Sequence, residues 1–268
     1  MAKKSQASRA AAPPTAPGPS PLDQIARMAA ASRLARFAWR GRGKAPAGYV
    51  KGMALVYGRV YCKFKAGDAA VLDMAHKKTG DQTHDALAWY EKVFKAAGMD
   101  NSTSGVDTLR HLFVLLIGLG MRETSGRYYE GRDTTARNTT ADTAEAGLFQ
   151  MSFNARTASP LLPRIFARYQ ANPSGFLDVF KDGVRPSAAS LRANLRNFGS
   201  GKGKEFQRLC KECPAFAAEF AAVALRHIRK HWGPIIRQQA QVRPECDALL
   251  RKVQAAIDAS PALRRALV

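Results

Sequence analysis

The chain has 268 residues, of which 46% are hydrophobic and 9% aromatic, so its composition excludes a chain that is disordered throughout. It carries 42 Lys and Arg against 21 Asp and Glu, a formal net charge of +21. This charge indicates an anionic partner, for which nucleic acid, an acidic membrane surface and the bacterial cell wall all qualify. The longest apolar stretch, Leu112 to Met121, is far shorter than the about 20 residues of a membrane-spanning helix.

The first 21 residues consist mainly of Ala, Pro, Ser and basic residues. They predict a disordered basic arm, either a solubilising tail or an electrostatic tether, and leave residues 22–268 as a single domain. The basic start Met1-Ala-Lys-Lys is followed by Ser, Ala and Pro instead of an apolar segment, so we expect no secretory signal. The protein would then stay in the cytoplasm or reach the cell wall or periplasm by a non-classical route.

From Leu22 onward the apolar residues recur with helical spacing and no run alternates as a strand does, which predicts a mainly α fold. One helix is expected over Val50 to Phe64, and a second over Ala86 to Phe94, with Gly98 as its stop. Asp107 is the expected cap of a third helix that carries Leu112 to Met121. This helix is apolar nearly all round, so it belongs at the centre of the fold.

A long polar segment, Gly126 to Ala144, follows the central helix and shows no apolar period. Loops of this length inside a domain are often functional. Helical patterns resume after it, over Leu161 to Tyr169, Pro173 to Phe180, Pro214 to Trp232 and Cys246 to Ile257.

The central helix ends in Gly120-Met-Arg-Glu-Thr-Ser-Gly126, which puts Glu123 where a buried helix meets the polar loop. A half-desolvated carboxyl group is harder to ionise, so it can hold a proton near neutral pH. Protonation of a glycosidic oxygen requires such a group. The alternative is that Glu123 merely ends the helix with an exposed charge.

A second motif, Gly147-Leu-Phe-Gln150, comes just after the polar loop. With Glu123-Thr-Ser-Gly126 before it, the chain resembles the lysozyme-like superfamily, particularly lytic transglycosylases and goose-type lysozymes. Those proteins place a catalytic Glu in a Glu-Ser-type motif at the end of a buried helix and line the sugar cleft with a Gly-Leu-Met-Gln motif. The resemblance extends from Leu109 to Asn154. It departs from the family where Thr124 replaces Ser and Phe149 replaces Met.

The resemblance implies a lysozyme-like α-helical domain in which the long polar loop belongs to the active site and Glu123 is the general acid, with no cofactor and no metal. The implied substrate is peptidoglycan or a related N-acetyl-sugar polymer. Gly147 would let the backbone approach a sugar, and the Gln150 amide can both donate and accept hydrogen bonds. The residues expected to bind the glycan are Ser125, Tyr128, Gly147, Leu148, Phe149 and Gln150, and the aromatic residues that could stack on sugar rings are Tyr128, Tyr129, Phe149, Phe153 and Trp232.

Many glycosidases use a second carboxylate, for which the polar loop and its flanks offer Glu130, Asp133, Asp142 and Glu145. None of the four has a decisive spacing from Glu123. The transglycosylases that this chain resembles manage with one Glu, because a hydroxyl of the substrate attacks and leaves an anhydro-sugar end. We therefore favour a single carboxylate, and hydrolysis stays open as the alternative.

A competing motif, Cys210-x2-Cys213-x13-His227-x3-His231, has the spacing of a zinc site and would suit a nucleic-acid-binding protein. However, Pro214 begins an Ala-rich run that predicts a continuous helix. Such a helix would separate Cys213 from His227 by roughly 21 Å, so four ligands could not meet around one ion. We therefore expect no zinc, and we expect Cys62, Cys210, Cys213 and Cys246 to be free buried thiols. A non-catalytic glycan-binding protein of the same fold is a further alternative.

Overall fold

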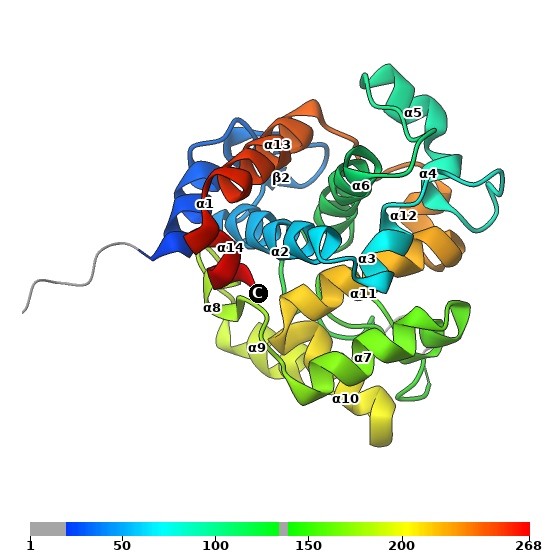
Figure 1. Ribbon diagram of the computed structural model, residues 1–268. Coiled ribbons are helices and arrows are strands. Elements are labelled where there is room, and N and C mark those ends of the chain that lie inside the picture. Colours follow the sequence, from blue (N-terminus) through cyan, green and yellow to red (C-terminus); the bar gives the residue numbers. More distant parts are fainter. Residues whose placement is uncertain (1–19, 134–138) are drawn as a thin grey trace, which may run out of the picture.

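The computed structural model describes residues 20–133 and 139–268 (Figure 1). Over these residues the fold is mainly helical, as predicted, with one short antiparallel hairpin, β1 (Ala38–Trp39) and β2 (Gly43–Lys44). The helices are α1 (Pro21–Ala30), α2 (Ala47–Lys65), α3 (Ala69–Met74), α4 (Ala86–Trp89), α5 (Glu91–Ala96), α6 (Val106–Thr124), α7 (Leu161–Ala171), α8 (Leu177–Phe180), α9 (Ala188–Leu195), α10 (Gly201–Glu212), α11 (Pro214–His227), α12 (Gly233–Ile236), α13 (Pro244–Ala259) and α14 (Pro261–Leu267), with 3-10 turns η1 (Leu34–Arg36), η2 (Phe153–Ala158) and η3 (Arg229–His231).

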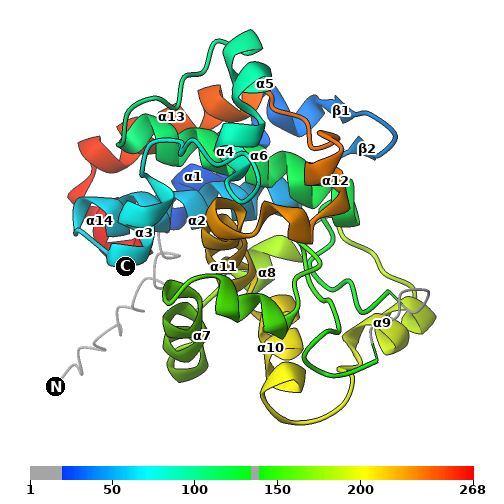
Figure 2. The same cartoon turned by 90° about the vertical axis from the view of Figure 1, so that its right-hand side faces the viewer.

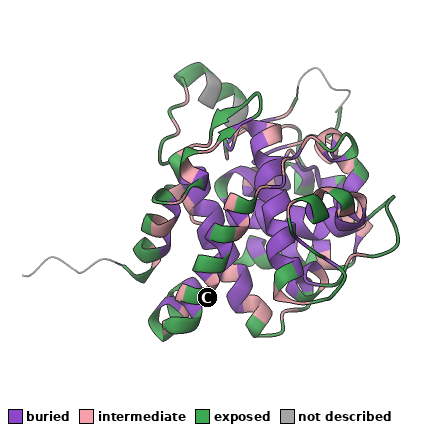
Figure 3. Cartoon of the chain, turned by 90° about the horizontal axis from the view of Figure 1, so that it is seen from above, coloured by how far each residue is buried: buried purple, intermediate pink, exposed green. Residues whose placement is uncertain are grey.

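Three mutually contacting helices, α2, α6 and α11, form the centre of the fold, and the other helices pack around them (Figures 1 and 2). Every residue of α6 from Thr108 to Met121 is buried, which confirms the prediction of a central helix. Burial is concentrated in these inner helices, whereas exposed residues lie mainly on the outer ones (Figure 3).

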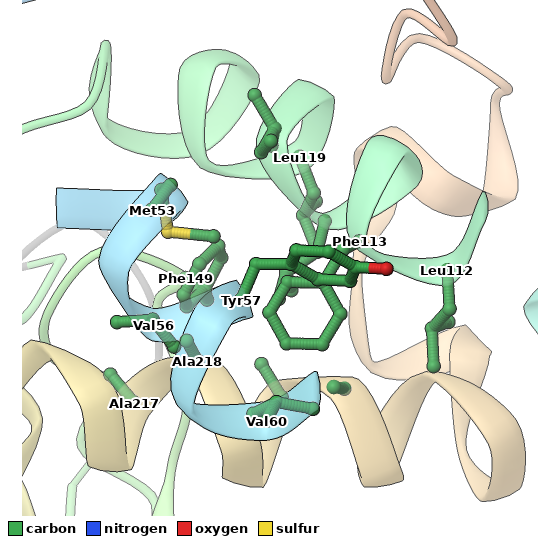
Figure 4. Packing of buried hydrophobic residues seen from close by; sticks show 14 of the residues in the cluster. Met53, Val56, Tyr57, Val60, Leu112, Phe113, Leu119, Phe149, Ala217 and Ala218 are labelled. Carbon is green, nitrogen blue, oxygen red and sulfur yellow. The ribbon is translucent and has the colours of Figure 1, made fainter. Parts of the chain in front are cut away.

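Aromatic side chains fill the space between the central helices (Figure 4). The rings of Tyr57 from α2 and Phe113 from α6 meet edge to face, with centroids 5.2 Å apart. Phe149, which lies outside any helix, inserts beside Met53 and Val56 of α2. The segment after the polar loop is therefore anchored in the core of the protein.

Several expected element boundaries were wrong. The helix expected over Ala86 to Phe94 is divided into α4 and α5 at Tyr90, where φ is −90° and ψ is 6°. Gly105, and not Asp107, stands at the N-cap of α6, and Asp107 lies in the first turn. The pattern from Pro173 to Phe180 forms only α8, because Phe176 adopts a left-handed conformation just before it.

The predicted basic arm lies outside the described residues except for Ser20 and Pro21, and the middle of the polar loop, residues 134–138, also lies outside them. Ser20 caps α1, because its side chain accepts from Leu22 N and its own N–H donates to Asp23.

No helix in the described part of the chain combines the length and the apolarity that crossing a bilayer requires.

The contact between α6 and the segment before α13 depends on a glycine. A Cβ atom at Gly118 would lie 2.2 Å from the backbone oxygen of Gln241. We predict that Gly118→Ala lowers the free energy of unfolding by about 1–3 kcal/mol, since the two backbones must separate. Chemical denaturation measures this change. The matched control is Gly80→Ala, where nothing lies within 4 Å of the added atom; an equal loss in both variants would contradict the packing argument.

Candidate active site

Glu123 is the penultimate residue of α6, and the chain leaves the helix at Ser125, two residues later. Ser125 adopts the left-handed conformation at φ 55°, and its N–H donates to Met121 O over 3.1 Å. The N–H of Gly126 donates to Gly120 O over 3.2 Å. These two bonds satisfy carbonyl groups that the helix end would leave unpaired, so the position of Glu123 is well defined.

Tyr49 of α2 packs against the same end of α6. Its hydroxyl donates to Ile117 O over 2.8 Å, and its ring is fully buried. A Cβ atom at Gly120 would lie 2.4 Å from the Tyr49 hydroxyl, and one at Gly126 would lie 2.8 Å from the ring. The two glycines that bracket the first motif therefore make room for this tyrosine.

Thr124 connects the two motifs, which are 24 residues apart in the chain. Its buried hydroxyl lies 3.1 Å from Gly120 O and 3.1 Å from Leu148 O. A threonine hydroxyl has one hydrogen to donate, so the two carbonyl oxygens share it. The structure thus brings Glu123-Thr-Ser-Gly126 and Gly147-Leu-Phe-Gln150 together, as the sequence suggested.

The second motif is a tight turn that His231, the last residue of η3, and Trp232 hold on its other side. Ala146 and Met151 pair as an antiparallel bridge across the turn. The indole of Trp232 donates to Phe149 O over 2.7 Å, and Nε2 of His231 lies 3.2 Å from Gln150 O. Since a carbonyl oxygen only accepts, the His231 nitrogen is the donor.

The structure corrects the expected glycan contacts of the second motif. Leu148 and Phe149 are 0% exposed, so they support the turn from the core and line no open surface. A Cβ atom at Gly147 would lie 2.4 Å from Cys210 O, so this glycine serves packing against α10 instead of approach to a sugar. The side-chain amide of Gln150 donates to Gly147 O over 3.1 Å, within its own turn.

Among the predicted contacts outside the turn, Ser125 and Tyr128 are half-buried. Tyr128 lies edge to face on buried Tyr129, with ring centroids 5.4 Å apart. Tyr129, Phe149, Phe153 and Trp232 are buried, so of the five aromatic candidates only Tyr128 keeps a face for a ligand.

Glu123 has the electrostatic environment of a proton donor. Its side chain is half-buried, and no hydrogen bond or ion pair holds its carboxyl group within residues 20–133 and 139–268. Burial raises the pKa of Glu123 to about 7, and the charge of Glu145 adds to the rise, while Arg42, Arg237 and Arg122 oppose it. The group is therefore about half protonated at neutral pH.

The four candidates for a second carboxylate occupy different environments. Glu130 forms an ion pair with Arg127, Asp142 lies 3.8 Å from Arg156, and Asp133 is exposed. Glu145 is half-buried, and its pKa is raised by burial and by the charge of Asp133. Because the charge of Glu145 also acts on Glu123, these two carboxyl groups are the pair that the structure brings together.

Sequence reasoning missed the arginines around Glu123. Arg42 lies in the turn of the β-hairpin and donates to Arg122 O over 2.5 Å, and Arg237 follows α12. They come from segments far apart in the chain, and nothing distinguishes them among 42 basic residues. Only Arg122 could have been found from the sequence, because it directly precedes Glu123.

The residues of the zinc-like motif do not converge. The helix predicted to begin at Pro214 is present as α11 (Pro214–His227), but it ends five residues before the expected Trp232, and the 3-10 turn η3 follows it. The thiols of Cys210 and Cys213 are buried, as are those of Cys62 and Cys246, whereas Nε2 of His227 lies 3.0 Å from Asp73. Over the described ranges, no three His, Cys, Asp or Glu side chains are arranged to hold a metal ion.

Comparisons with protein-family models, with curated proteins and with solved structures find no match to this chain. The case for a function therefore depends on the geometry and chemistry of the site itself.

Substitution of Thr124 tests whether its hydroxyl links the two motifs. Thr124→Val keeps the volume but removes the donor, so Leu148 O loses this partner, and we predict a loss of about 1–3 kcal/mol in the free energy of unfolding. Thr124→Ser keeps the hydroxyl and should lose less. Denaturant titration of both variants measures the difference, and an unchanged Thr124→Val protein would argue against the link.

The raised pKa of Glu123 predicts a pH-dependent effect on stability. Between its ordinary value of 4.5 and about 7, the folded protein binds more protons than the unfolded chain, so the free energy of unfolding falls as pH rises. Glu123→Gln removes this loss. The free energy of unfolding of the variant, relative to that of the wild type, should therefore rise by up to about 3 kcal/mol between pH 4 and pH 8. Denaturation curves at the two pH values measure it, and a difference independent of pH would rule out the raised pKa.

Proposed function

We propose that this chain is a glycan-cleaving enzyme of the lysozyme-like kind, a lytic transglycosylase or muramidase, with Glu123 as its general acid. The observation that carries the proposal is the carboxyl group of Glu123, half-buried at the end of the central helix, with a pKa of about 7. The turn that Thr124 joins to this helix end supports the resemblance from which the proposal began.

A pKa near 7 suits the chemistry. A general acid works best when it holds its proton at the working pH and still releases it readily to the leaving oxygen. An ordinary exposed glutamate would be ionised at neutral pH and would have no proton to give. Because Glu123 is half-buried at the end of α6, its raised pKa lets it keep a proton at neutral pH.

Two routes can follow protonation of the glycosidic oxygen. If a hydroxyl of the substrate attacks, one carboxyl group is enough and the product has an anhydro end. If water attacks, a second carboxylate must activate it or stabilise the sugar cation, and Glu145 is then the candidate that its surroundings favour over Glu130, Asp133 and Asp142. Mass analysis of the products distinguishes the routes, because the two ends differ by one water.

The proposed substrate is peptidoglycan or a related N-acetyl-sugar polymer. The net charge of +21 suits an anionic wall. It would also suit nucleic acid, but His227 and His231 of the zinc-like motif are engaged with Asp73 and with Gln150 O, which removes the specific argument for that alternative. A glycan-binding protein without turnover would bind the same polymer and release no product.

The decisive variant is Glu123→Gln, which keeps the size of the side chain and removes its proton. General acid catalysis contributes about 10² to 10⁴ in rate, so cleavage of purified peptidoglycan should fall at least about a hundredfold while binding persists. Release of soluble fragments measures the rate. A correctly folded Glu123→Gln protein that cuts at the wild-type rate would exclude Glu123 as the acid.

Glu145→Gln tests the second carboxylate, with Glu130→Gln as its matched control. Under the single-carboxylate route both variants should retain most of the activity. A collapse at Glu145 alone, comparable to that of Glu123→Gln, would instead establish a hydrolase with two carboxyl groups.

A further inference from the structure

A pocket of about 510 Å³ lies between the end of α6, the β-hairpin and the segment after α12. Figure 2 shows the hairpin and α12 close together beside α6. Four arginines, Arg40, Arg122, Arg237 and Arg243, line this pocket together with three glutamines, and its lining includes no Asp or Glu. We call it the arginine pocket.

Most of the positive charge in the arginine pocket is not held in ion pairs. Arg243 pairs with Glu245 over 3.2 Å and stacks on the ring of Phe37. Arg40, Arg122 and Arg237 form no ion pair with any carboxylate of residues 20–133 and 139–268. Like charges that converge on one hollow repel one another, and a bound anion would relieve this repulsion.

The walls of the arginine pocket are fixed by contacts that need no ligand. The backbone of Gln241 packs directly on Gly118 of α6. The amide of Gln238 donates to Trp89 O over 2.8 Å, and Arg122 donates to the side-chain oxygen of Gln239 over 3.2 Å. Contacts that need no ligand therefore hold the guanidinium groups of Arg122 and Arg243. The planar fork of an arginine matches the paired oxygens of carboxylate and phosphate groups.

The arginine pocket adjoins the candidate active site. Arg122 is the residue before Glu123, and the charges of Arg122 and Arg237 both act on the Glu123 carboxyl group. An anion held by these arginines would thus lie at the same end of α6 as Glu123.

We propose that the arginine pocket binds an oxyanion, a carboxylate or a phosphate, that is carried by the glycan. This inference rests on the proposed function and narrows it, because the substrate is then an acidic glycan whose charged substituent is recognised beside the cleavage point. Neutral chains of the same sugars would lack this contact and bind more weakly.

The test uses the full chain with Glu123→Gln as the parent, so that ligands are bound without being cut. The pocket variant adds Arg40→Gln and Arg237→Gln. The control variant adds Arg27→Gln and Arg265→Gln, two exposed residues of α1 and α14 that lie outside the pocket and give the same change in net charge. Calorimetry at low salt compares an N-acetylglucosamine oligomer with one of equal length that contains N-acetylmuramic acid.

We expect the parent and the control variant to bind the acidic oligomer about tenfold or more tightly than the neutral one, and the pocket variant to lose this preference. A preference that survives in the pocket variant, or that disappears equally in the control variant, would overturn the proposal. A change that is equal in both variants would show a general effect of net charge.

Titration with inorganic phosphate separates this inference from the proposed function. If the parent binds phosphate and the pocket variant does not, the oxyanion site is supported, whether or not an oligomer binds. Failure of both oligomers to bind would count against glycan cleavage, not against the oxyanion site. Phosphate binding together with equal affinity for both oligomers would show that the anion comes free from solution, and phosphate binding retained by the pocket variant would overturn the site itself.

Discussion

Burial of α6 is the constraint on which the rest of the candidate site depends. The helix is enclosed from Thr108 to Met121, so the side chain of Glu123, two residues further, emerges from an apolar environment. The same enclosure makes the Thr124 hydroxyl valuable, because a buried donor must find an acceptor and finds one in the turn that follows the polar loop. The raised pKa of Glu123 and the position of that turn therefore have a common origin in the packing of one helix.

The sequence predicted the helices whose residues repeat over many turns. α2 and α13 carry a long apolar period, and α6 and α11 are long apolar segments, so each was recognisable as a helix from many residues at once. The errors fall where a single residue changes the backbone direction, as at Tyr90 and Phe176. Both residues contact distant parts of the chain, since the Tyr90 hydroxyl bonds to Pro234 O and Arg59 lies over the Phe176 ring. A pattern of apolar residues carries no information about such contacts.

In the candidate site, too, some residues could be predicted from the sequence and others could not. Glu123 was identifiable, because its position at the end of an apolar helix is visible in the sequence. The role of Gly147 was misjudged: a glycine permits close approach, but the sequence does not say of what, and here the neighbour is the backbone of α10. The arginines of the arginine pocket converge from three separate segments, so only the fold reveals them as a group.

The four cysteines have a consequence for where the protein can work. All of them are buried thiols, and burial raises the pKa of Cys213 to about 11, so the reactive thiolate is scarce. No disulfide contributes to the packing of the described residues. The packing of these residues therefore does not require the oxidation of any thiol. A chain made in a reducing compartment would keep the same structure after transfer to an oxidising one, with no need for an oxidase or an isomerase on arrival.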